Sequence, residues 1–224
     1  MNIMKGTNAY FKQLTKKDFK IKKHRGFIGG MWDELGTLQF NFLIENGLKP
    51  NHKLLDIGCG CLRGGVKFID YLDVKNYYGI DINESLIEAA NLEIAEYKLE
   101  EKCANLLVDN NFEFEKFEEK FDFMVSISVF SHLPFQNIVK CLVNARQNLK
   151  ETGVYFATYF EAPFSAHIEE IHQKPGNIVT KYDMDPFHYS NEEMKYMAQL
   201  AGLNVDIIGD WNHPRNQKIA AFTI

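Results

Sequence analysis

The sequence predicts an α/β fold: a doubly wound, mostly parallel sheet of seven strands, with helices on both faces and an antiparallel last strand. Two observations predict it. Strand-like apolar runs alternate with helical patterns five times along the chain, as expected for a parallel sheet covered by its crossover helices. Two more strand-like runs then follow one another across a short link, and a short link makes neighbouring strands antiparallel.

The first half of the chain supplies three of the expected strands, over residues 53–57, 76–82 and 104–109. A helix capped by Asp33 and stopped by Gly47 and Pro50 precedes them. Another helix, over residues 63–72, joins the first two strands. Ser85 and Glu88 have the spacing of a capping box, which predicts the start of the next crossover helix.

The second half supplies the remaining strands. They are predicted over residues 121–127, 153–159, 203–208 and 219–224. Pro134 suits the first position of the helix between the fourth and fifth strands. Ser190 and Glu193 form a second capping-box pattern, and the helix that they begin stops at Gly202.

The elements suggest a division of the chain into an arm and one domain. We expect a basic N-terminal arm with lid helices over residues 1–50 and a single domain over residues 51–224. Residues 161–189 follow no clean period and contain three prolines, so we expect an insertion or a lid there.

Charge is unevenly distributed between these parts. Residues 1–25 hold eight basic residues and one acidic residue, a formal charge of +7, whereas the whole chain carries −5. A basic arm can contact phosphates, although a solvated or lid-forming segment is the plainer interpretation. The acidic remainder of the chain argues against a broad nucleic-acid footprint.

Composition excludes several classes of protein. Hydrophobic residues make up 46% and charged residues 25%, a balance typical of soluble globular proteins rather than disordered, collagen-like or coiled-coil chains. No apolar run is long enough for a membrane-spanning helix, and the first residues lack the apolar core of a secretory signal. Four cysteines are too few for a disulfide scaffold and fit reduced thiols in a cytoplasm.

The strongest local signal is the glycine-rich loop over residues 56–65, which follows a strand and opens a helix. Asp81 stands at the end of the next strand, where a carboxylate can accept hydrogen bonds from ribose hydroxyls. The third glycine, Gly64, arrives one residue later than in the dinucleotide fingerprint. This looser turn favours an amino-acid tail over a pyrophosphate.

At these residues the chain resembles the class I (Rossmann-like) S-adenosylmethionine-dependent methyltransferases. The sequence LDIGCG, residues 55–60, looks like the first motif of that family, and the resemblance covers roughly residues 50–160 by motif. It implies S-adenosylmethionine as cofactor and S-adenosylhomocysteine as product. The residues that it implies for cofactor binding are Trp32, Asp56, Gly58, Cys59, Gly60, Arg63, Gly64, Asp81, Ile82, Asp109, Asn110, Ser126 and Ser128.

The resemblance also implies a part for each of these residues. The glycine turn would line the amino-acid part of the cofactor, Asp81 would bind the ribose, and Asp109 and Asn110 would lie near the adenine. Residues 126–130 would face both the cofactor and the acceptor. Trp32 would either close over the cofactor or pack in the core.

His132 is the candidate catalytic residue. Methyl transfer from a sulfonium depends mainly on proximity and alignment, so a base is needed only where the acceptor must lose a proton. His132 follows the fourth strand, and a histidine titrates in the range that suits a general base. The alternative is that it fixes a loop or caps the helix at Pro134.

The polar link over residues 209–218 supplies candidate acceptor-binding groups. Arg215 can hold a carboxylate or a phosphate, and Trp211 can stack on a flat or cationic group. The alternative is a rigid hairpin turn packed by Trp211. The candidate acceptor-binding residues are Tyr159, Glu161, Trp211, His213 and Arg215.

No metal site is predicted. The expected insertion contributes polar side chains at Glu161, His167, His172, Tyr182, Asp183 and His188. These residues show no tight His/carboxylate motif, and Cys59 with Cys61 lacks the matching second pair of a zinc site.

The sequence therefore predicts an enzyme that moves a methyl group to an oxygen or nitrogen of a small polar acceptor. Arg215, His213 and the basic arm favour an anionic acceptor: phosphorylated, carboxylated, or linked to a nucleotide or sugar. The closing stretch resembles bacterial methyltransferases that modify small polar or surface-polysaccharide precursors. We expect no membrane partner, and the sequence does not distinguish a monomer from a dimer.

Three alternatives stay open at this point. The first is an RNA methyltransferase that uses the basic arm; the acidic body argues against it, as does the sequence SISV at residues 126–129 where base-modifying relatives carry an N-P-P-Y-like motif. The second is a nicotinamide-dependent oxidoreductase, which the late Gly64 disfavours. The third is a non-catalytic nucleotide-binding partner protein, which would bind the cofactor without turnover.

Overall fold

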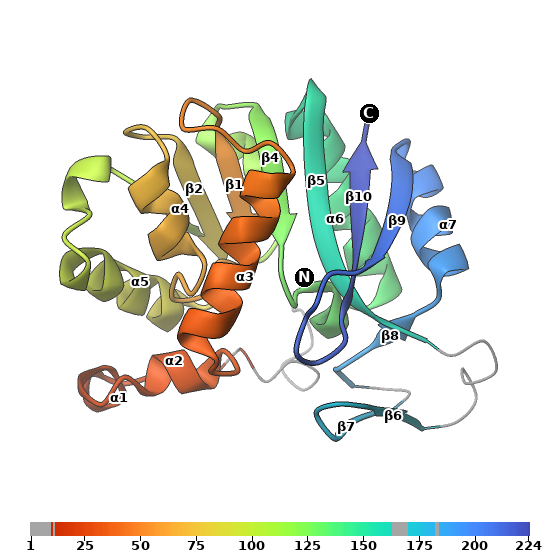
Figure 1. Cartoon of the computed structure of the whole chain (residues 1–224), viewed down its shortest axis with the longest axis horizontal. Coiled ribbons are helices and arrows are strands. Elements are labelled where there is room, and N and C mark those ends of the chain that lie inside the picture. The colour runs from red at the N-terminus through yellow and green to blue at the C-terminus, as the bar shows by residue number, and fades with distance from the viewer. Residues whose placement is uncertain (1–9, 11, 163–169, 182–183) are drawn as a thin grey trace. The chain divides into compact units, whose positions relative to one another are not determined.

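A computed structural model of the chain describes residues 10, 12–162, 170–181 and 184–224. These residues form two compact units, one of residues 10–113 and one of residues 114–224 (Figure 1). Some residues named above lie outside the described part of the chain, namely His167, Tyr182 and Asp183, as does Pro163, the first of the three prolines in residues 161–189.

The unit of residues 10–113 is built on three parallel strands. They are β1 (Leu54–Ile57), β2 (Tyr77–Asp81) and β3 (Asn105–Val108), in the order β3-β2-β1. Their crossover helices are α4 (Gly65–Tyr71) and α5 (Glu84–Glu96), and the short 3-10 helix η2 (Glu100–Lys102) precedes β3. Every residue of β1 and β2 is buried, as expected for parallel strands covered by helices. The predicted alternation is confirmed here.

Three helices precede this sheet. They are α1 (Lys16–Lys20), α2 (Lys23–Phe27) and α3 (Trp32–Glu45). The first two have five residues each, which is too short for a helical period to be recognised in the sequence. The prediction that Asp33 caps α3 is wrong, because Met31 occupies that position in a left-handed conformation and Asp33 lies in the first turn.

The cap of α5 also differs from the prediction. Asn83, not Ser85, is the N-cap: its side-chain oxygen accepts hydrogen bonds from the backbone N–H of Ser85 and of Leu86, at 2.9 and 3.3 Å. Asparagine and serine are almost equally good caps, so composition alone could not choose between them. Ser85 instead accepts a hydrogen bond from the backbone N–H of Leu14 at 2.9 Å.

The unit of residues 114–224 contains the remaining main strands. They are β4 (Phe121–Ser126), β5 (Leu149–Glu161), β9 (Asn204–Asp210) and β10 (Lys218–Thr223), in the order β4-β5-β10-β9. β4 and β5 are parallel, and β10 runs antiparallel to both of its neighbours. The predicted fold class is therefore confirmed, including the reversed last strand.

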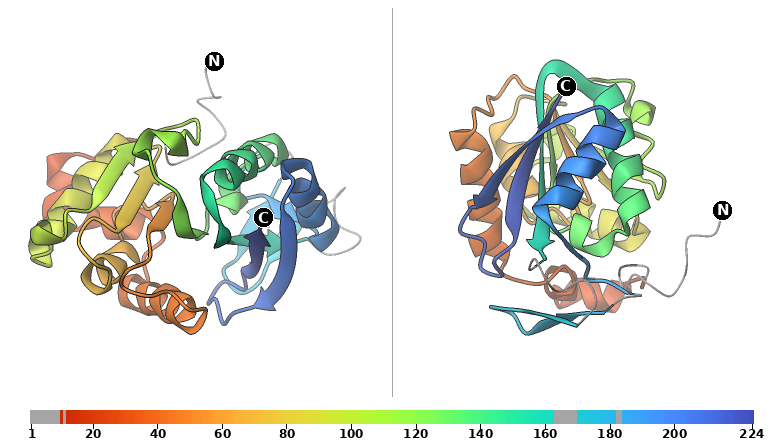
Figure 2. Two further views of the ribbon diagram at one scale, coloured as in Figure 1. Left: turned by 90° about the horizontal axis from the view of Figure 1, so that it is seen from above. Right: turned by 90° about the vertical axis from the view of Figure 1, so that its right-hand side faces the viewer.

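Two long helices cover strands of this unit. They are α6 (Phe135–Asn148) and α7 (Asn191–Ala201), which pack side by side (Figure 2). The short 3-10 helices η3 (Phe114–Phe117) and η4 (Phe130–His132) lie on either side of β4 in the chain. Pro134 is the N-cap of α6 rather than its first residue. The capping box of Ser190 and Glu193 is confirmed, and α7 ends at Gly202 in a left-handed conformation.

The stretch expected to be an insertion contains short strands among its described residues. β6 (Ile171–Gln173) and β7 (Ile178–Thr180) form an antiparallel hairpin. β8 (His188–Tyr189) pairs in parallel with the end of β5. None of the helices in the described ranges is long and apolar enough to cross a membrane.

Candidate functional site

The glycine-rich loop connects β1 to α4 through a backbone path that needs glycine. Gly58 and Gly60 have φ angles of 70° and 55°, a region that side chains with a Cβ rarely adopt. The backbone N–H groups of Gly58 and Cys59 donate to the carbonyl oxygen of Ile80, at 2.7 and 3.1 Å. The loop is therefore attached to the end of the neighbouring strand β2.

Asp81, the last residue of β2, completes this attachment. One carboxylate oxygen accepts from the backbone N–H of Gly60 at 2.8 Å and the other from the N–H of Asn83 at 2.8 Å. Burial raises the pKa of Asp81 to about 6, and the backbone hydrogen bonds from Asn83 and Gly60 oppose that rise. A carboxylate offers about four acceptor positions, so this side chain can accept further hydrogen bonds while it holds the loop.

Asp109 lies beside Asp81 because β2 and β3 are parallel neighbours. Its backbone N–H donates to the carbonyl oxygen of Asp81 at 3.0 Å. Its carboxylate accepts from the N–H groups of Asn111 and Glu113, at 2.7 and 3.2 Å, and so shapes the turn after β3. Asn110 is exposed on that turn. The carboxyl ends of these two strands thus gather polar groups, as in other open α/β sheets that bind ligands there.

The later glycines of the loop serve helix packing. A Cβ atom on Gly64 would collide with the side-chain oxygen of Gln39 from α3. A Cβ atom on Gly65 would lie 2.7 Å from the hydroxyl oxygen of Tyr77. Close packing of α4 against its neighbours therefore explains why Gly64 and Gly65, which follow the turn, are also glycines.

Asp56, in the middle of β1, points into the interior. It accepts a hydrogen bond from the hydroxyl of Tyr77 at 2.8 Å. Burial raises the pKa of its carboxyl to about 7, and the nearby Asp81 adds to the rise. Cys59 is also buried, which raises the pKa of its thiol well above the usual value. Cofactor contact by Asp56 and Cys59 stays a prediction.

Arg63 and Trp32 both have hydrogen-bond partners: Arg63 binds the N-terminal segment, and Trp32 binds Tyr97, the C-cap residue of α5. The guanidinium of Arg63 donates to the carbonyl oxygens of Ile28 and Gly30, at 3.2 and 3.1 Å. The indole N–H of Trp32 donates to the hydroxyl of Tyr97 at 3.1 Å. Trp32 also packs against a cluster of buried residues that includes Cys61 of the loop. This arrangement favours the packing interpretation of Trp32, and its contact with a cofactor stays a prediction, as does that of the half-buried Ile82.

Two residues that the sequence analysis missed hold the N-terminal segment against α5. The side-chain amide of Asn83 donates to the carbonyl oxygens of Tyr10 and Lys12, at 2.6 and 3.0 Å. Glu93 is buried and binds Arg25 through two hydrogen bonds, at 2.8 and 2.6 Å, and His24 through one at 2.6 Å. A glutamate on the apolar face of the α5 pattern was the available signal, because a buried carboxylate needs a partner.

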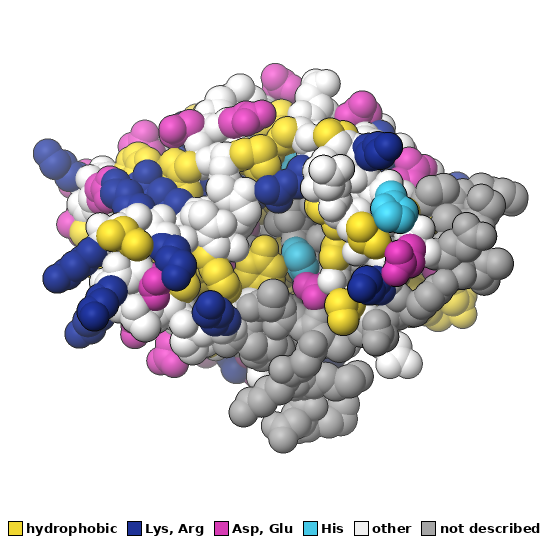
Figure 3. Space-filling model, turned by 90° about the horizontal axis from the view of Figure 1, so that it is seen from below, with side chains coloured by type: hydrophobic (Ala, Val, Ile, Leu, Met, Phe, Trp, Pro, Cys, Tyr) yellow, Lys and Arg dark blue, Asp and Glu magenta, His cyan; other side chains and the backbone are white. Residues whose placement is uncertain are grey.

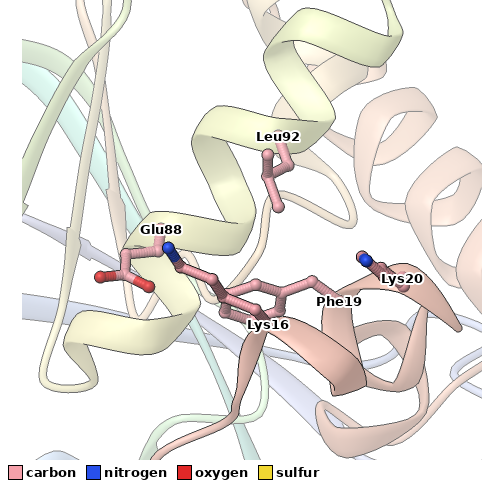
Figure 4. Close-up of a pocket in the computed structure, with 5 residues that line it drawn as sticks. All are labelled: Lys16, Phe19, Lys20, Glu88 and Leu92. Carbon is pink, nitrogen blue, oxygen red and sulfur yellow. The ribbon is translucent and has the colours of Figure 1, made fainter.

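A groove of about 400 Å³ lies between α1 and α5. It is lined by Lys16, Phe19 and Lys20 of α1 and by Glu88 and Leu92 of α5 (Figure 4). The space-filling view has lysine and arginine side chains crowded on the left, the side on which Figure 1 has α1 (Figure 3). The basic arm thus presents a charged outer surface, and phosphate contact there stays a prediction.

In the unit of residues 114–224, a polar network joins three segments. The backbone N–H of Ser128 donates to the hydroxyl of Thr158 at 2.7 Å, and the Ser128 hydroxyl donates to Gln217 at 3.0 Å. The Thr158 hydroxyl also donates to Gln217, at 2.8 Å. Ser126 lies deeper and shares a hydrogen bond of 2.8 Å with the hydroxyl of Tyr155. The sequence analysis missed Thr158 and Gln217, which are far from Ser128 along the chain.

His132 ends the 3-10 helix η4 and meets a carboxylate that the sequence analysis did not consider. Its Nδ1 atom lies 2.6 Å from Oδ2 of Asp185. The side chain of His132 is 23% exposed and that of Asp185 11%. The two residues are 53 positions apart, and no sequence pattern connects them.

The candidate acceptor-binding residues form two groups. Tyr159 donates to the side-chain oxygen of Asn191 at 2.5 Å, and the Asn191 amide donates to Glu161 at 2.9 Å. In the link before β10, the rings of Trp211 and His213 stack with centroids 5.4 Å apart, and both residues are buried.

Arg215 belongs to the second group and is half-buried in the link before β10. Its backbone N–H donates to Nδ1 of His213 at 3.1 Å, and its carbonyl oxygen accepts from Gln173 of the β6–β7 hairpin at 2.9 Å. Packing explains Trp211 and His213, while acceptor binding by all five candidate residues stays a prediction. In the described ranges, no three His, Cys, Asp or Glu side chains gather as a metal site would require.

Residues 55–155, which include the loop, Asp81 and Asp109, match the family model described as a methyltransferase domain. Over these residues the chain is similar to methyltransferase domains. Its curated relatives include the 24-methylenesterol C-methyltransferase 2 of Oryza sativa subsp. japonica, 30% identical over 165 residues. That match covers 70% of this chain and 42% of the rice protein, so the chain spans about two fifths of its relative's length.

Solved methyltransferase structures share the fold of this domain. The CcbJ methyltransferase from Streptomyces caelestis aligns with a TM-score of 0.68 at 13% identity, covering 96% of this chain and 98% of that one. Magnesium protoporphyrin IX methyltransferase from Synechocystis PCC 6803, with S-adenosylhomocysteine bound, aligns with a TM-score of 0.64 at 13% identity. That alignment covers 95% of this chain and 90% of the Synechocystis chain.

Proposed function

We propose that the protein transfers a methyl group from S-adenosylmethionine to an oxygen or nitrogen of a small polar, anionic acceptor. The observation that carries the proposal is the glycine loop whose Gly60 N–H is bound by Asp81, inside the residues that match a methyltransferase domain. The Synechocystis structure, with S-adenosylhomocysteine bound to the same fold, supports the choice of cofactor.

The residues present fit this cofactor. Gly58 and Gly60 lack a Cβ atom, which suits close approach of an amino-acid group to the turn, and the side chain of Ile28 lies 3.3 Å from where a Cβ on Gly60 would stand. Asp81 accepts backbone hydrogen bonds from Asn83, Gly60 and Ile82, and its remaining acceptor position suits a ribose hydroxyl. The polar turn at Asp109 and Asn110 suits the adenine. When bound, the cofactor supplies an activated methyl group on a sulfonium. We assign residues 1–50 the part of a lid; in the described part of this segment, Asn83 binds Tyr10 and Lys12, and Glu93 binds His24 and Arg25.

His132 is the proposed general base. The cofactor, held by the glycine turn, Asp81 and the turn at Asp109 and Asn110, would supply the methyl group to the acceptor's oxygen or nitrogen and would keep the bonding electrons on sulfur as a neutral thioether. The proton that the acceptor loses moves to His132. General-base assistance of this kind contributes typically about 10²- to 10⁴-fold to a rate.

The acceptor is inferred from the polar groups around Arg215. Its guanidinium suits a carboxylate or a phosphate, and Glu161 with Tyr159 suits sugar hydroxyls. We therefore favour phosphorylated, carboxylated, or nucleotide- or sugar-linked metabolites, among them precursors of surface polysaccharides. We place the protein in the cytoplasm, where the thiols of Cys59 and Cys61 stay reduced.

A second candidate function comes from the rice relative, whose name describes methylation of a sterol carbon. Transfer to carbon would need an electron-rich double bond in the acceptor and an apolar binding surface. One assay separates the two candidates: release of S-adenosylhomocysteine is measured with anionic metabolites and sugar nucleotides in one series and with sterols in detergent in another. Turnover confined to the sterol series would overturn the anionic acceptor and leave the cofactor assignment intact.

The cofactor assignment is tested by Asp81→Asn. The substitution keeps the size of the side chain but removes the charge that favours ribose hydroxyl donors, so we expect affinity for S-adenosylmethionine to fall at least about tenfold. Isothermal titration calorimetry measures the change. Asp206→Asn, on the exposed side of β9, is the matched control and should bind as the wild type does. Unchanged affinity in Asp81→Asn would contradict the assignment.

A further inference from the structure

We propose that Asp185 is a positioning residue that fixes the ring of His132 and selects which of its nitrogens receives the acceptor's proton. The inference rests on the proposed function, in which His132 is the base. It starts from the 2.6 Å contact between Oδ2 of Asp185 and Nδ1 of His132. Both side chains are mostly withdrawn from water, which strengthens a hydrogen bond between them.

The contact belongs to a set of three that joins the segment of residues 185–189 to the turn of residues 131–133. The backbone N–H of Phe187 donates to the carbonyl oxygen of Ser131 at 2.6 Å. The hydroxyl of Tyr189 donates to the carbonyl oxygen of Leu133 at 2.6 Å. Every second residue of the segment thus binds the turn, so the register of the segment brings the carboxylate of Asp185 to the imidazole.

The segment that carries Asp185 also contacts β5, β6 and β7. The hydroxyl of Thr180, on β7, donates to the carbonyl oxygen of Pro186 at 2.7 Å. The ring of His188 stacks on Phe160 of β5 with centroids 5.0 Å apart, and its Nε2 lies 3.1 Å from the side-chain oxygen of Gln173. The carboxylate is therefore presented by a braced stretch of chain, which limits the positions available to the His132 ring.

The chemistry of the pair follows from the two imidazole nitrogens. An ionised carboxylate only accepts hydrogen bonds, so the neutral ring must carry its proton on Nδ1 to use this contact. The lone pair is then on Nε2, the nitrogen on the opposite side of the ring. When Nε2 takes the acceptor's proton, the ring becomes positively charged and Asp185 stabilises that charge without itself taking the proton, as the acid of a catalytic triad does.

This assignment gives the irregular stretch of residues 161–189 a part in the reaction. Asp185 lies between β7 and β8, within a stretch that interrupts the alternation of strands and helices. Such stretches carry functional groups more often than the elements of the scaffold do. In this protein the scaffold supplies His132, and the inserted stretch supplies the group that orients it.

The direct test reads the protonation of the ring rather than turnover. In ¹⁵N-labelled protein saturated with S-adenosylhomocysteine, the imidazole nitrogen shifts report which nitrogen of neutral His132 carries the proton, and His132→Gln identifies the signals. We expect the proton on Nδ1 in the wild type and mainly on Nε2 in Asp185→Ala. Asp185→Asn is the second variant should the alanine variant fail to fold. Because it removes the charge, it should also shift the proton of neutral His132 from Nδ1 towards Nε2.

Turnover provides the second readout, with the acceptor series described above as probe. Asp185→Ala should lower kcat about 10- to 100-fold while the KM for S-adenosylmethionine changes less than about twofold, because the ring acts on the acceptor's proton. Tyr189→Phe is the matched control: it removes one hydrogen bond of the same segment, while the contacts of Phe187, Pro186 and His188 keep the register that presents Asp185. It should keep the wild-type proton position and kcat.

Three outcomes would overturn the inference. An unchanged proton position in Asp185→Ala would show that the carboxylate does not select the nitrogen. Equal decreases in kcat in Tyr189→Phe and Asp185→Ala would show that Asp185 only holds the segment in place. Wild-type turnover in His132→Gln would remove the base that Asp185 is proposed to orient. Failure of the proposed function is distinguishable, because it appears as absent S-adenosylmethionine binding in calorimetry of the unmodified protein.

Discussion

Asp56 and Asp81 are buried carboxylates on neighbouring strands that lie in different hydrogen-bonding surroundings. Asp81 accepts hydrogen bonds from backbone N–H groups of the glycine loop and of the α5 cap. Asp56 has the hydroxyl of Tyr77 as its partner. Burial raises the pKa of Asp56 to about 7 and that of Asp81 to about 6. A carboxyl that binds protons more tightly in the folded state makes folding less favourable once the pH is high enough to ionise it.

The pH dependence of stability tests this reasoning at Asp56. Its ordinary pKa is 3.8 and its folded pKa about 7, so the folded state binds more protons between these values. The stabilisation is fully present below pH 3.8 and is lost as the pH rises through about 7. Asp56→Asn should remove this loss and leave the variant more stable than the wild type at pH 8, by about 1–3 kcal/mol.

Urea unfolding at pH 5 and at pH 8 measures the effect on the free energy of unfolding. The wild type should lose stability between the two values, and Asp56→Asn should lose less, with the remaining slope due to Asp81. Asp206→Asn serves as an exposed control. Parallel losses in the wild type and in Asp56→Asn would refute the buried, proton-binding state of Asp56.

At the scale of elements, the docking of α2 on α5 depends on the buried side chain of Glu93. The short helices α1 and α2 have too few residues to be stable alone, so tertiary contacts must hold them. Glu93 binds Arg25 and His24 with its carboxylate almost fully out of water, its side chain being 2% exposed. By contrast, Glu96 is nearly half exposed and binds Lys22 at the surface.

Glu93→Gln should therefore destabilise the protein by about 2–4 kcal/mol, because it leaves the partly buried guanidinium of Arg25 without its counter-charge. The midpoint of urea unfolding measures the loss. Glu96→Gln is the matched control one helical turn away, and it should move the midpoint little, since exposed ion pairs contribute little. Similar shifts in the two variants would mean that Glu93 does not hold the N-terminal segment.

At the scale of the whole molecule, the four cysteines divide by burial across both units. Cys59, Cys61 and Cys141 are buried free thiols, whereas Cys103 is exposed. Burial raises the pKa of Cys61 and of Cys141 to about 12 and that of Cys59 well above its usual range. The thiolate is the reactive form, so the folded chain protects all of these groups except Cys103.

Thiol titration with Ellman's reagent should reveal this division. In the native protein we expect one fast-reacting thiol, from Cys103, and slow reaction of the others at the rate at which the structure opens. Cys103→Ser should abolish the fast phase and leave the slow one unchanged. A fast phase that persists in Cys103→Ser would show that the glycine loop or α6 is open to reagent in the native state.

Much of the fold could be predicted because its signals are local. The strands, the crossover helices and the reversed last strand follow from apolar periodicity, turn residues and link length. The glycine loop and Asp81 could be predicted together because parallel neighbouring strands end at the same edge of a sheet. The choice of Asn83 over Ser85 as cap could not, since both residues suit the position and contacts with the N-terminal segment occupy both.

The sequence by itself determined the fold class, the glycine loop and the carboxylate after the second strand, because each depends on residues close together in the chain. The tertiary structure alone decided the pairing of His132 with Asp185, the binding of Glu93 to the N-terminal helices and the joining of Ser128 to Gln217. These contacts join residues from 53 to 89 positions apart. Over such separations no periodicity connects two side chains, and only the folded backbone brings them within hydrogen-bonding distance.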